Sequence, residues 1–174
     1  MKTGAKLGIA LAGALGVSAG GVALIKHREG TVKRDGMHVA YPDPGTNGVP
    51  WTICYGSTTG VRRGMVLTDR ECDERLRQDI SVAEAAIRRN VKVPLSQPEY
   101  DAYVSFIFNV GETQFRSSTM LRLLNQGFRE QACRQLPRWV YANGKVMNGL
   151  RTRRNQEMQV CLMFNKDYVY VPAT

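Results

Sequence analysis

The feature that most constrains this chain is an uncharged stretch near its amino terminus. The 19 residues from Leu7 to Ile25 comprise five Gly, five Ala, one Ser and eight Leu, Ile or Val. A helix of about 20 apolar residues crosses a bilayer, so this stretch is long enough to span one. Because the stretch ends at residue 25, it divides the chain into an amino-terminal segment, residues 1–25, and a body, residues 26–174. The body is long enough to form one domain of ordinary size.

The stretch is only weakly apolar. Eight aliphatic side chains contribute roughly −2.5 to −5 kcal/mol to membrane insertion, and the glycines detract from it. Three interpretations stay open: a stable anchor, a signal peptide cleaved near Val17-Ser18-Ala19, and an anchor that can leave the bilayer.

The net charge of +9 and the pI near 9.7 indicate an anionic partner. Nucleic acid is not the expected one. The basic residues are spread over several segments, and no zinc-finger, KH-type or RNP-type pattern accompanies them.

The cysteines, which are Cys54, Cys72, Cys133 and Cys161, form no CxxC pair, and the chain has only two histidines. We therefore expect no metal site and no cofactor. An even number of cysteines behind an export-like amino terminus favours two disulfides in an oxidising compartment, with buried free thiols as the alternative.

Turn and capping signals give the order of the elements. Residues 30–64 are rich in Gly, Pro, Tyr and Thr, which is typical of short strands and loops. Capping boxes at Thr68–Glu71 and Ser96–Glu99 open two long helices. Shorter helices are expected over residues 118–126, 129–136 and 150–163. The pattern predicts an α+β fold with a small β-containing lobe and a larger helical lobe on either side of a cleft.

Three residues could carry chemistry. Glu29 follows a predicted helix, Asp43 lies in a turn, and Thr52 lies in a predicted strand. Two carboxylates in different environments are what glycoside hydrolysis requires. No GxSxG, HExxH or phosphate-binding loop competes with them.

The spacing of these residues resembles that of the bacteriophage lysozymes of glycoside hydrolase family 24. The motifs that carry the resemblance are Glu29-Gly30, Tyr41-Pro42-Asp43, Trp51-Thr52-Ile53-Cys54-Tyr55-Gly56, Phe108-Asn109-Val110-Gly111, Arg138-Trp139 and Arg153-Arg154. They cover about residues 26–163. With the weak anchor in front, the chain is most similar to the signal-anchor-release endolysins.

The resemblance implies a lysozyme-like muramidase that cleaves the β-1,4 bond between N-acetylmuramic acid and N-acetylglucosamine. Glu29 would be the general acid, Asp43 would orient water or stabilise charge, and Thr52 would help to hold the attacking water. Inversion requires roughly 6.5–9.5 Å between the two carboxyl groups. Asp35 is a rival for the second carboxylate, because 13 residues separate Glu29 from Asp43, more than in the compact form of the motif.

The remaining motif residues have weaker implications. Asn109 either bonds an N-acetyl group of the sugar or caps its helix. Arg138 and Trp139 either line the cleft or, for the tryptophan, pack in the core. Arg151, Arg153 and Arg154 are expected to form a solvated helix face. The resemblance also pairs Cys54 with Cys72 and Cys133 with Cys161.

These expectations describe a monomeric phage endolysin. Residues 1–25 form its signal-anchor-release segment, residues 7–25 hold it transiently in the host inner membrane, and residues 26–174 reach peptidoglycan from the periplasmic face and then from the periplasm. A helix formed by about Ala19 to Arg28 would present Glu29 after release. The alternatives are a catalytically silent, membrane-anchored peptidoglycan-binding protein and a lytic transglycosylase.

Overall fold

The computed structural model describes residues 16–26, 32–42, 50–142 and 144–173, so Glu29 and Asp43 lie outside the described residues. Its helices are α1 Ala19–Lys26, α2 Asp69–Asn90, α3 Gln97–Val110, α4 Glu112–Arg116, α5 Thr119–Asn125, α6 Arg129–Cys133, a 3-10 turn Leu136–Arg138 and α7 Asn148–Cys161. Its strands are β1 Lys33–Arg34, β2 Met37–Val39, β3 Tyr41–Pro42, β4 Trp51–Thr52, β5 Val66–Leu67, β6 Leu95–Ser96, β7 Tyr141–Ala142, β8 Lys145–Val146 and β9 Tyr168–Tyr170.

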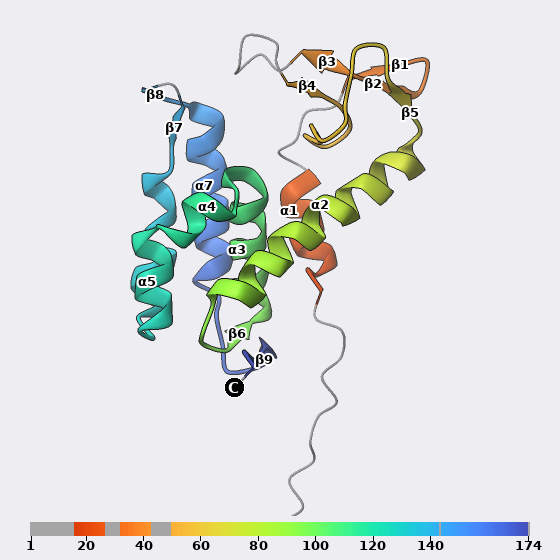
Figure 1. The fold of residues 1–174 in the computed structure, drawn as a ribbon. Helices are drawn as coiled ribbons and strands as arrows, with labels where there is room; N and C mark the ends of the chain where they lie inside the picture. The colour runs from red at the N-terminus through yellow and green to blue at the C-terminus, as the bar shows by residue number, and fades with distance from the viewer. Residues whose placement is uncertain (1–15, 27–31, 43–49, 143, 174) are drawn as a thin grey trace, which may run out of the picture.

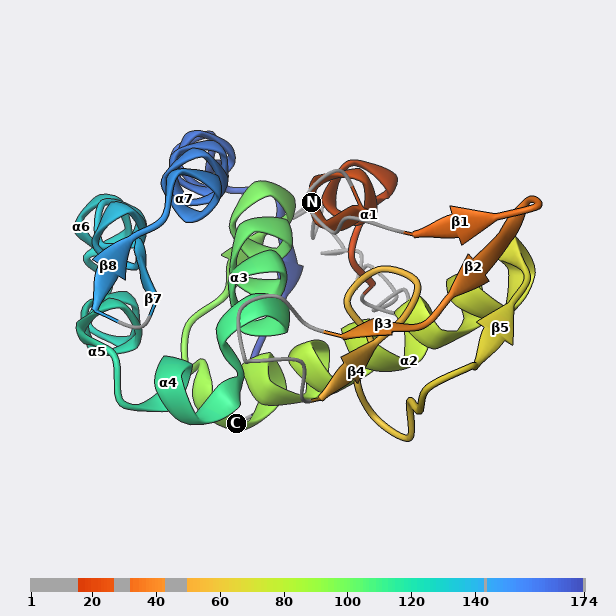
Figure 2. The ribbon, with the colours of Figure 1, turned by 90° about the horizontal axis from the view of Figure 1, so that it is seen from above.

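The helical lobe is built around α3, which α1, α2 and α7 surround (Figure 2). Tyr100, Tyr103 and Phe106 of α3 are fully buried. They lie within one large apolar core to which all four helices contribute. Helix α3 is therefore the central, largely buried helix of this lobe.

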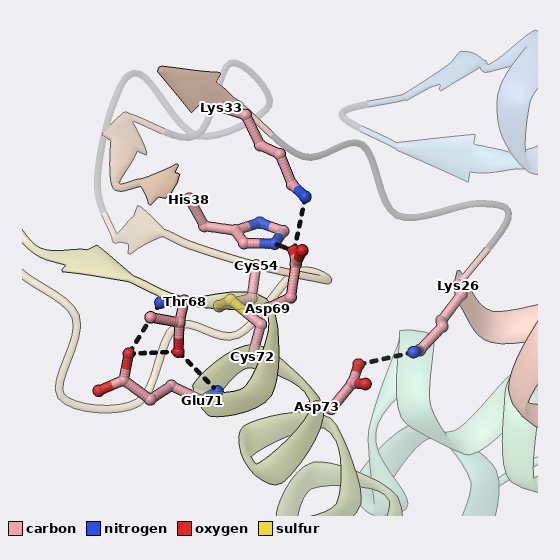
Figure 3. Close-up of polar contacts among 9 residues, drawn as sticks. All are labelled: Lys26, Lys33, His38, Cys54, Thr68, Asp69, Glu71, Cys72 and Asp73. Carbon is pink, nitrogen blue, oxygen red and sulfur yellow. Dashed lines mark hydrogen bonds and ion pairs between the residues drawn. A yellow bond between two sulfur atoms is a disulfide. The ribbon is translucent and has the colours of Figure 1, made fainter. Parts of the chain in front are cut away.

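Both predicted capping boxes are present. Thr68 Oγ1 accepts a hydrogen bond from the Glu71 backbone N–H, and the Glu71 carboxylate accepts from the Thr68 N–H at 2.7 Å (Figure 3). Glu99 accepts from the Ser96 backbone N–H at 2.9 Å and from its hydroxyl at 2.8 Å. Each box satisfies backbone donors that have no partner within the helix, and so fixes where α2 and α3 begin.

The later helices differ from the prediction in detail. The helix predicted over residues 129–136 ends at Cys133 and is followed by the separate 3-10 turn at Leu136–Arg138. Helix α7 begins at Asn148, two residues before the predicted start. Helix α4 and the pairing of β6 with β9 were not predicted.

The β lobe consists of two small antiparallel sheets that lie over the amino-terminal half of α2 (Figure 1). One has the order β1-β2-β5, and the other pairs β3 with β4 in the register Tyr41↔Thr52. A small second core holds Ala40, Ile53, Cys54 and Cys72. The predicted α+β class, with a small β lobe and a larger helical lobe, is confirmed.

Two disulfides join neighbouring elements. Cys54, just after β4, pairs with Cys72 and ties the β lobe to α2, and Cys133 pairs with Cys161 and ties α6 to α7 within the helical lobe. These are the pairs that the family resemblance implies. Within the described ranges, no helix is both long and apolar enough to cross a membrane.

Candidate active site

A cleft of about 250 Å³ lies where the β lobe meets the helical lobe. The segment after β4 forms one wall with Gly56, Ser57, Thr58 and Thr59. The other wall comes from α2, from the last turn of α3 and from the start of α4, and includes Phe108, Gly111 and Glu112. The two lobes thus meet at a concave site.

The described carboxylates of this cleft are already engaged. Asp79 of α2 accepts a hydrogen bond from the Ser57 hydroxyl. Glu112 accepts from Arg89 at 2.9 Å and from Asn90 at 2.8 Å, and these bonds lower its pKa to about 2. A carboxyl group with so low a pKa stays ionised at neutral pH and cannot serve as a general acid. Glu112 is therefore not a candidate for a proton donor in this cleft.

Both predicted carboxylates lie close in sequence to the end of a described element. Glu29 follows Lys26, the last residue of α1, by three positions, and Asp43 directly follows Pro42, the last residue of β3. Strand β3 pairs with β4, which carries Thr52.

Thr52 of β4 is a buried residue with an unpartnered hydroxyl among the described residues. It is 6% exposed, and no described group forms a hydrogen bond with its Oγ1. A buried hydroxyl without a partner costs free energy, so its presence calls for an explanation. The role predicted for Thr52, holding a water, would provide one.

Helix α1 packs on α3 through specific polar contacts. The backbone N–H of Ser18 donates to Asp101 Oδ1 at 2.9 Å, and its hydroxyl donates to Asp101 Oδ2. The same hydroxyl accepts from the Gly21 N–H and so caps the helix. Gly21 is buried against Asp101, and Ile25, one turn later, is fully buried in the main core.

The end of α1 is fastened to α2. Lys26 Nζ lies 2.6 Å from Asp73 Oδ1 (Figure 3) and 4.8 Å from the centre of the Tyr55 ring. The hydrogen bond with Asp73 raises the pKa of Lys26 and lowers that of Asp73. The last described residue before Glu29 is thus anchored between the two lobes.

The interpretation of the arginine cluster as a solvated face is wrong for two of its three members. Arg153 is 4% exposed and Arg154 is fully buried, and both pair with Glu157 of α7, at 3.1 Å in each case. Arg151 alone of the three is exposed. The missed signal was Glu157 itself, which lies four and three residues after the two arginines.

The two predicted substrate-binding residues lie in different settings. Asn109, in the last turn of α3, is exposed, and its Oδ1 accepts a hydrogen bond from Arg154 at 2.6 Å. Arg138 is exposed on the 3-10 turn and donates to Gln135. Trp139 is half-buried and packs edge-on against Phe106 at 5.2 Å. The tryptophan therefore contributes to the core.

Two further residues of the β lobe have structural explanations. Asp35 is exposed in the turn between β1 and β2 and has a φ of 49°, and that turn lies at the far edge of the lobe from α3 (Figure 2). His38 is 1% exposed beside the Cys54–Cys72 disulfide, with its Nε2 2.7 Å from Asp69 Oδ1 (Figure 3). Asp69 also pairs with Lys33, so it holds both strands of the hairpin to α2.

Comparison with known proteins fits this geometry. The family model described as phage lysozyme matches residues 30–157. A SAR-endolysin of Enterobacteria phage PA-2 is 42% identical over 113 residues, which are 64% of this chain and 68% of that protein.

Solved structures give the same result. The muramidase domain of SpmX from Asticaccaulis excentricus superposes with a TM-score of 0.74 at 34% identity, covering 84% of this chain and 97% of that one. The active form of the P1 phage endolysin Lyz superposes with a TM-score of 0.70 at 27% identity, covering 84% of each chain. The chain therefore belongs to the phage lysozyme family: it is a lysozyme-type hydrolase with the lytic function of a phage endolysin.

Proposed function

We propose that the chain is a muramidase that hydrolyses the β-1,4 bond between N-acetylmuramic acid and N-acetylglucosamine in peptidoglycan. Glu29 protonates the glycosidic oxygen as the bond to the anomeric carbon breaks. Asp43 orients and deprotonates the water that attacks from the opposite face, and Thr52 holds this water. Family membership supports the reaction class, and the low pKa of Glu112 removes that carboxylate of the cleft as a competing acid.

We also propose that residues 1–25 tether the protein to the host inner membrane and that it becomes active in the periplasm after release. One observation carries this proposal. The last third of the uncharged stretch, residues 19–25, is not a separate segment but belongs to α1, an integral helix of the lobe that adjoins the cleft. A residue cannot lie in lipid and pack on α3 at the same time, so membrane insertion and the folded site exclude one another.

Zymography on peptidoglycan tests the catalytic assignment. Glu29→Gln should lose about 10²- to 10⁴-fold in rate, which is what a general acid contributes. Asp43→Asn should also be strongly impaired. Asp35→Asn is the matched control, because it makes the same chemical change in an exposed turn, and it should retain activity. Activity of Glu29→Gln equal to that of the wild type would remove the assignment.

Mass spectrometry of the products separates the enzymatic alternatives. Hydrolysis adds one water for each bond cleaved and leaves a reducing end, whereas a lytic transglycosylase leaves an anhydro sugar without added water. A wild-type protein that binds peptidoglycan but yields neither product would be the catalytically silent binding protein.

Membrane release can be tested without touching α1. Leucine at Gly8, Ala10, Ala12 and Ala14 strengthens insertion at positions that precede the docked helix. This variant should remain in the membrane fraction and delay lysis, and serine at the same four positions should do the opposite. Equal release of both variants would contradict the tether.

A further inference from the structure

Arg154 is fully buried and donates a hydrogen bond to the exposed side chain of Asn109, which adjoins Phe108 of the cleft wall in sequence. Asn109 lies in the last turn of α3, between Phe108 and Gly111, both of which line the cleft. Its Oδ1 accepts from Nη2 of Arg154 at 2.6 Å. An arginine side chain has only donors, so the group that faces it must be the oxygen of the amide. The NH₂ group of Asn109 therefore points away from Arg154.

The arginine itself has little freedom to move. Its guanidinium lies 4.9 Å from the centre of the Phe106 ring and pairs with Glu157 at 3.1 Å. Glu157 is held in turn by the Ser105 hydroxyl, 2.7 Å from its Oε1, and by Arg153. None of these side chains is more than 5% exposed. The network joins α3 to α7 and holds Arg154 in place. Arg154 in turn holds the exposed side chain of Asn109.

We infer that Arg154 is a positioning residue for substrate binding, because it fixes Asn109 so that the NH₂ group donates to the N-acetyl carbonyl oxygen of a bound sugar. This inference rests on the proposed function. The amide oxygen of an N-acetyl group is a strong neutral acceptor, and both sugars of the glycan carry one. A free asparagine could present either its oxygen or its nitrogen, and only the second would bind this acceptor. Because Arg154 binds the oxygen of Asn109, the NH₂ group is the one left to face a sugar.

Asn109→Asp replaces the NH₂ group of the side chain by an oxygen and keeps the oxygen that faces Arg154. The aspartate keeps an oxygen toward Arg154, so the protein should remain as stable as the wild type, but it has no donor for the sugar. We expect KM for the glycan to rise about 3- to 10-fold with little change in kcat, the sign of an interaction present equally in ground and transition states. Asn155→Asp, the same change at an exposed position of α7, is the matched control and should leave both constants unchanged.

De-N-acetylated glycan identifies the acceptor when it is assayed above the pKa of its free amines, so that no ammonium group is present to attract the introduced aspartate. The wild type should prefer the acetylated substrate, and Asn109→Asp should lose most of that preference, since its missing donor no longer matters. Arg154→Lys keeps the charge but not the geometry, and should also lower the preference. A purely structural Arg154 would instead lower the melting temperature and impair both substrates alike.

The possible results distinguish a failure of the inference about Arg154 and Asn109 from a failure of the proposed function. An unchanged preference in Asn109→Asp, with an active wild type, overturns the inference and leaves the muramidase assignment intact. A wild type that releases no reducing ends from either glycan overturns the proposed function first. If Arg154→Lys fails to fold, the preference measured for the stable Asn109→Asp variant still decides whether the oriented amide is used.

Discussion

Gly20 and Gly21 are neighbours in α1, and substitutions at these two positions can separate the packing of this helix on the rest of the protein from its affinity for the membrane. A Cβ atom on Gly21 would lie 2.7 Å from Asp101 Oδ1 and would also collide with Val17. Asp101 cannot simply turn away, because it accepts hydrogen bonds from Ser18 and from Gln97. A Cβ on Gly20 would meet only the Ser18 hydroxyl, at an ordinary contact distance of 3.5 Å.

The magnitudes follow from this difference. Both Gly→Ala changes fall in the first turn of the same helix, so both gain up to about 1 kcal/mol of helix propensity and add one methyl group to the anchor. Only Gly21→Ala overpacks a buried contact, which costs about 1–3 kcal/mol. The two variants should therefore differ by about 5- to 150-fold in the equilibrium between docked and undocked α1.

Thermal unfolding of the purified, released protein measures this difference. For a protein of this size, about 1 kcal/mol shifts the melting temperature by about 2–4 °C, so Gly21→Ala should melt about 2–12 °C below Gly20→Ala. The difference should shrink in an Asp101→Ala background, because the colliding carboxylate is then gone. If Gly21→Ala melts at or above the temperature of Gly20→Ala, α1 does not dock on Asp101 as the structure has it.

Two other predictions concern the cleft wall and the β lobe. The pKa of Glu112 lies below its ordinary value of 4.5, at about 2, so its bonds with Arg89 and Asn90 should stabilise the fold above about pH 4.5 and lose that effect as the pH falls toward 2. Unfolding curves of wild type and Glu112→Gln should converge over that range, and a constant gap would contradict the assignment. Cys54 has a φ of 57°, which costs about 1–2 kcal/mol for a residue with a side chain, so Cys54→Gly with Cys72→Ser should be more stable to urea than serine at both positions. Equal midpoints would show that the disulfide, and not the local backbone, imposes that conformation.

Local signals in the sequence account for what was predicted well. The capping boxes at Thr68 and Ser96 predicted the starts of α2 and α3 because each uses contacts within four residues. Asp35-Gly36, an Asp-Gly pair of the kind that favours a turn, lies in the glycine-rich residues 30–64 and forms the turn of the β1–β2 hairpin, where both residues have positive φ. Such features need no knowledge of the rest of the chain.

The errors fall where distant segments meet. Strand β6 pairs with β9 across more than 70 residues, and neither strand is longer than three residues, so no periodicity announces them. The burial of Arg154 depends on Phe106 and Asn109 of another helix as well as on Glu157. A charge pattern within α7 could predict the ion pair with Glu157 but not that the pair is excluded from water.

In the proposed release, the segment that contains α1 either lies in the membrane or docks on the rest of the protein. The small and polar residues of this segment determine which of the two states is favoured. Ile25 is removed from water in both states, so its burial, worth about 1.5–3 kcal/mol against exposure, favours neither. Lipid cannot replace the hydrogen bonds of Ser18 with Asp101, or the pairing of Lys26 with Asp73, and it does not require the absence of a side chain at Gly21. Release is thus favoured by contacts that hydropathy does not count. The same glycine that weakens insertion is the one that lets α1 approach α3, so Gly21→Ala should shift the balance toward the membrane by more than its added methyl group alone would predict.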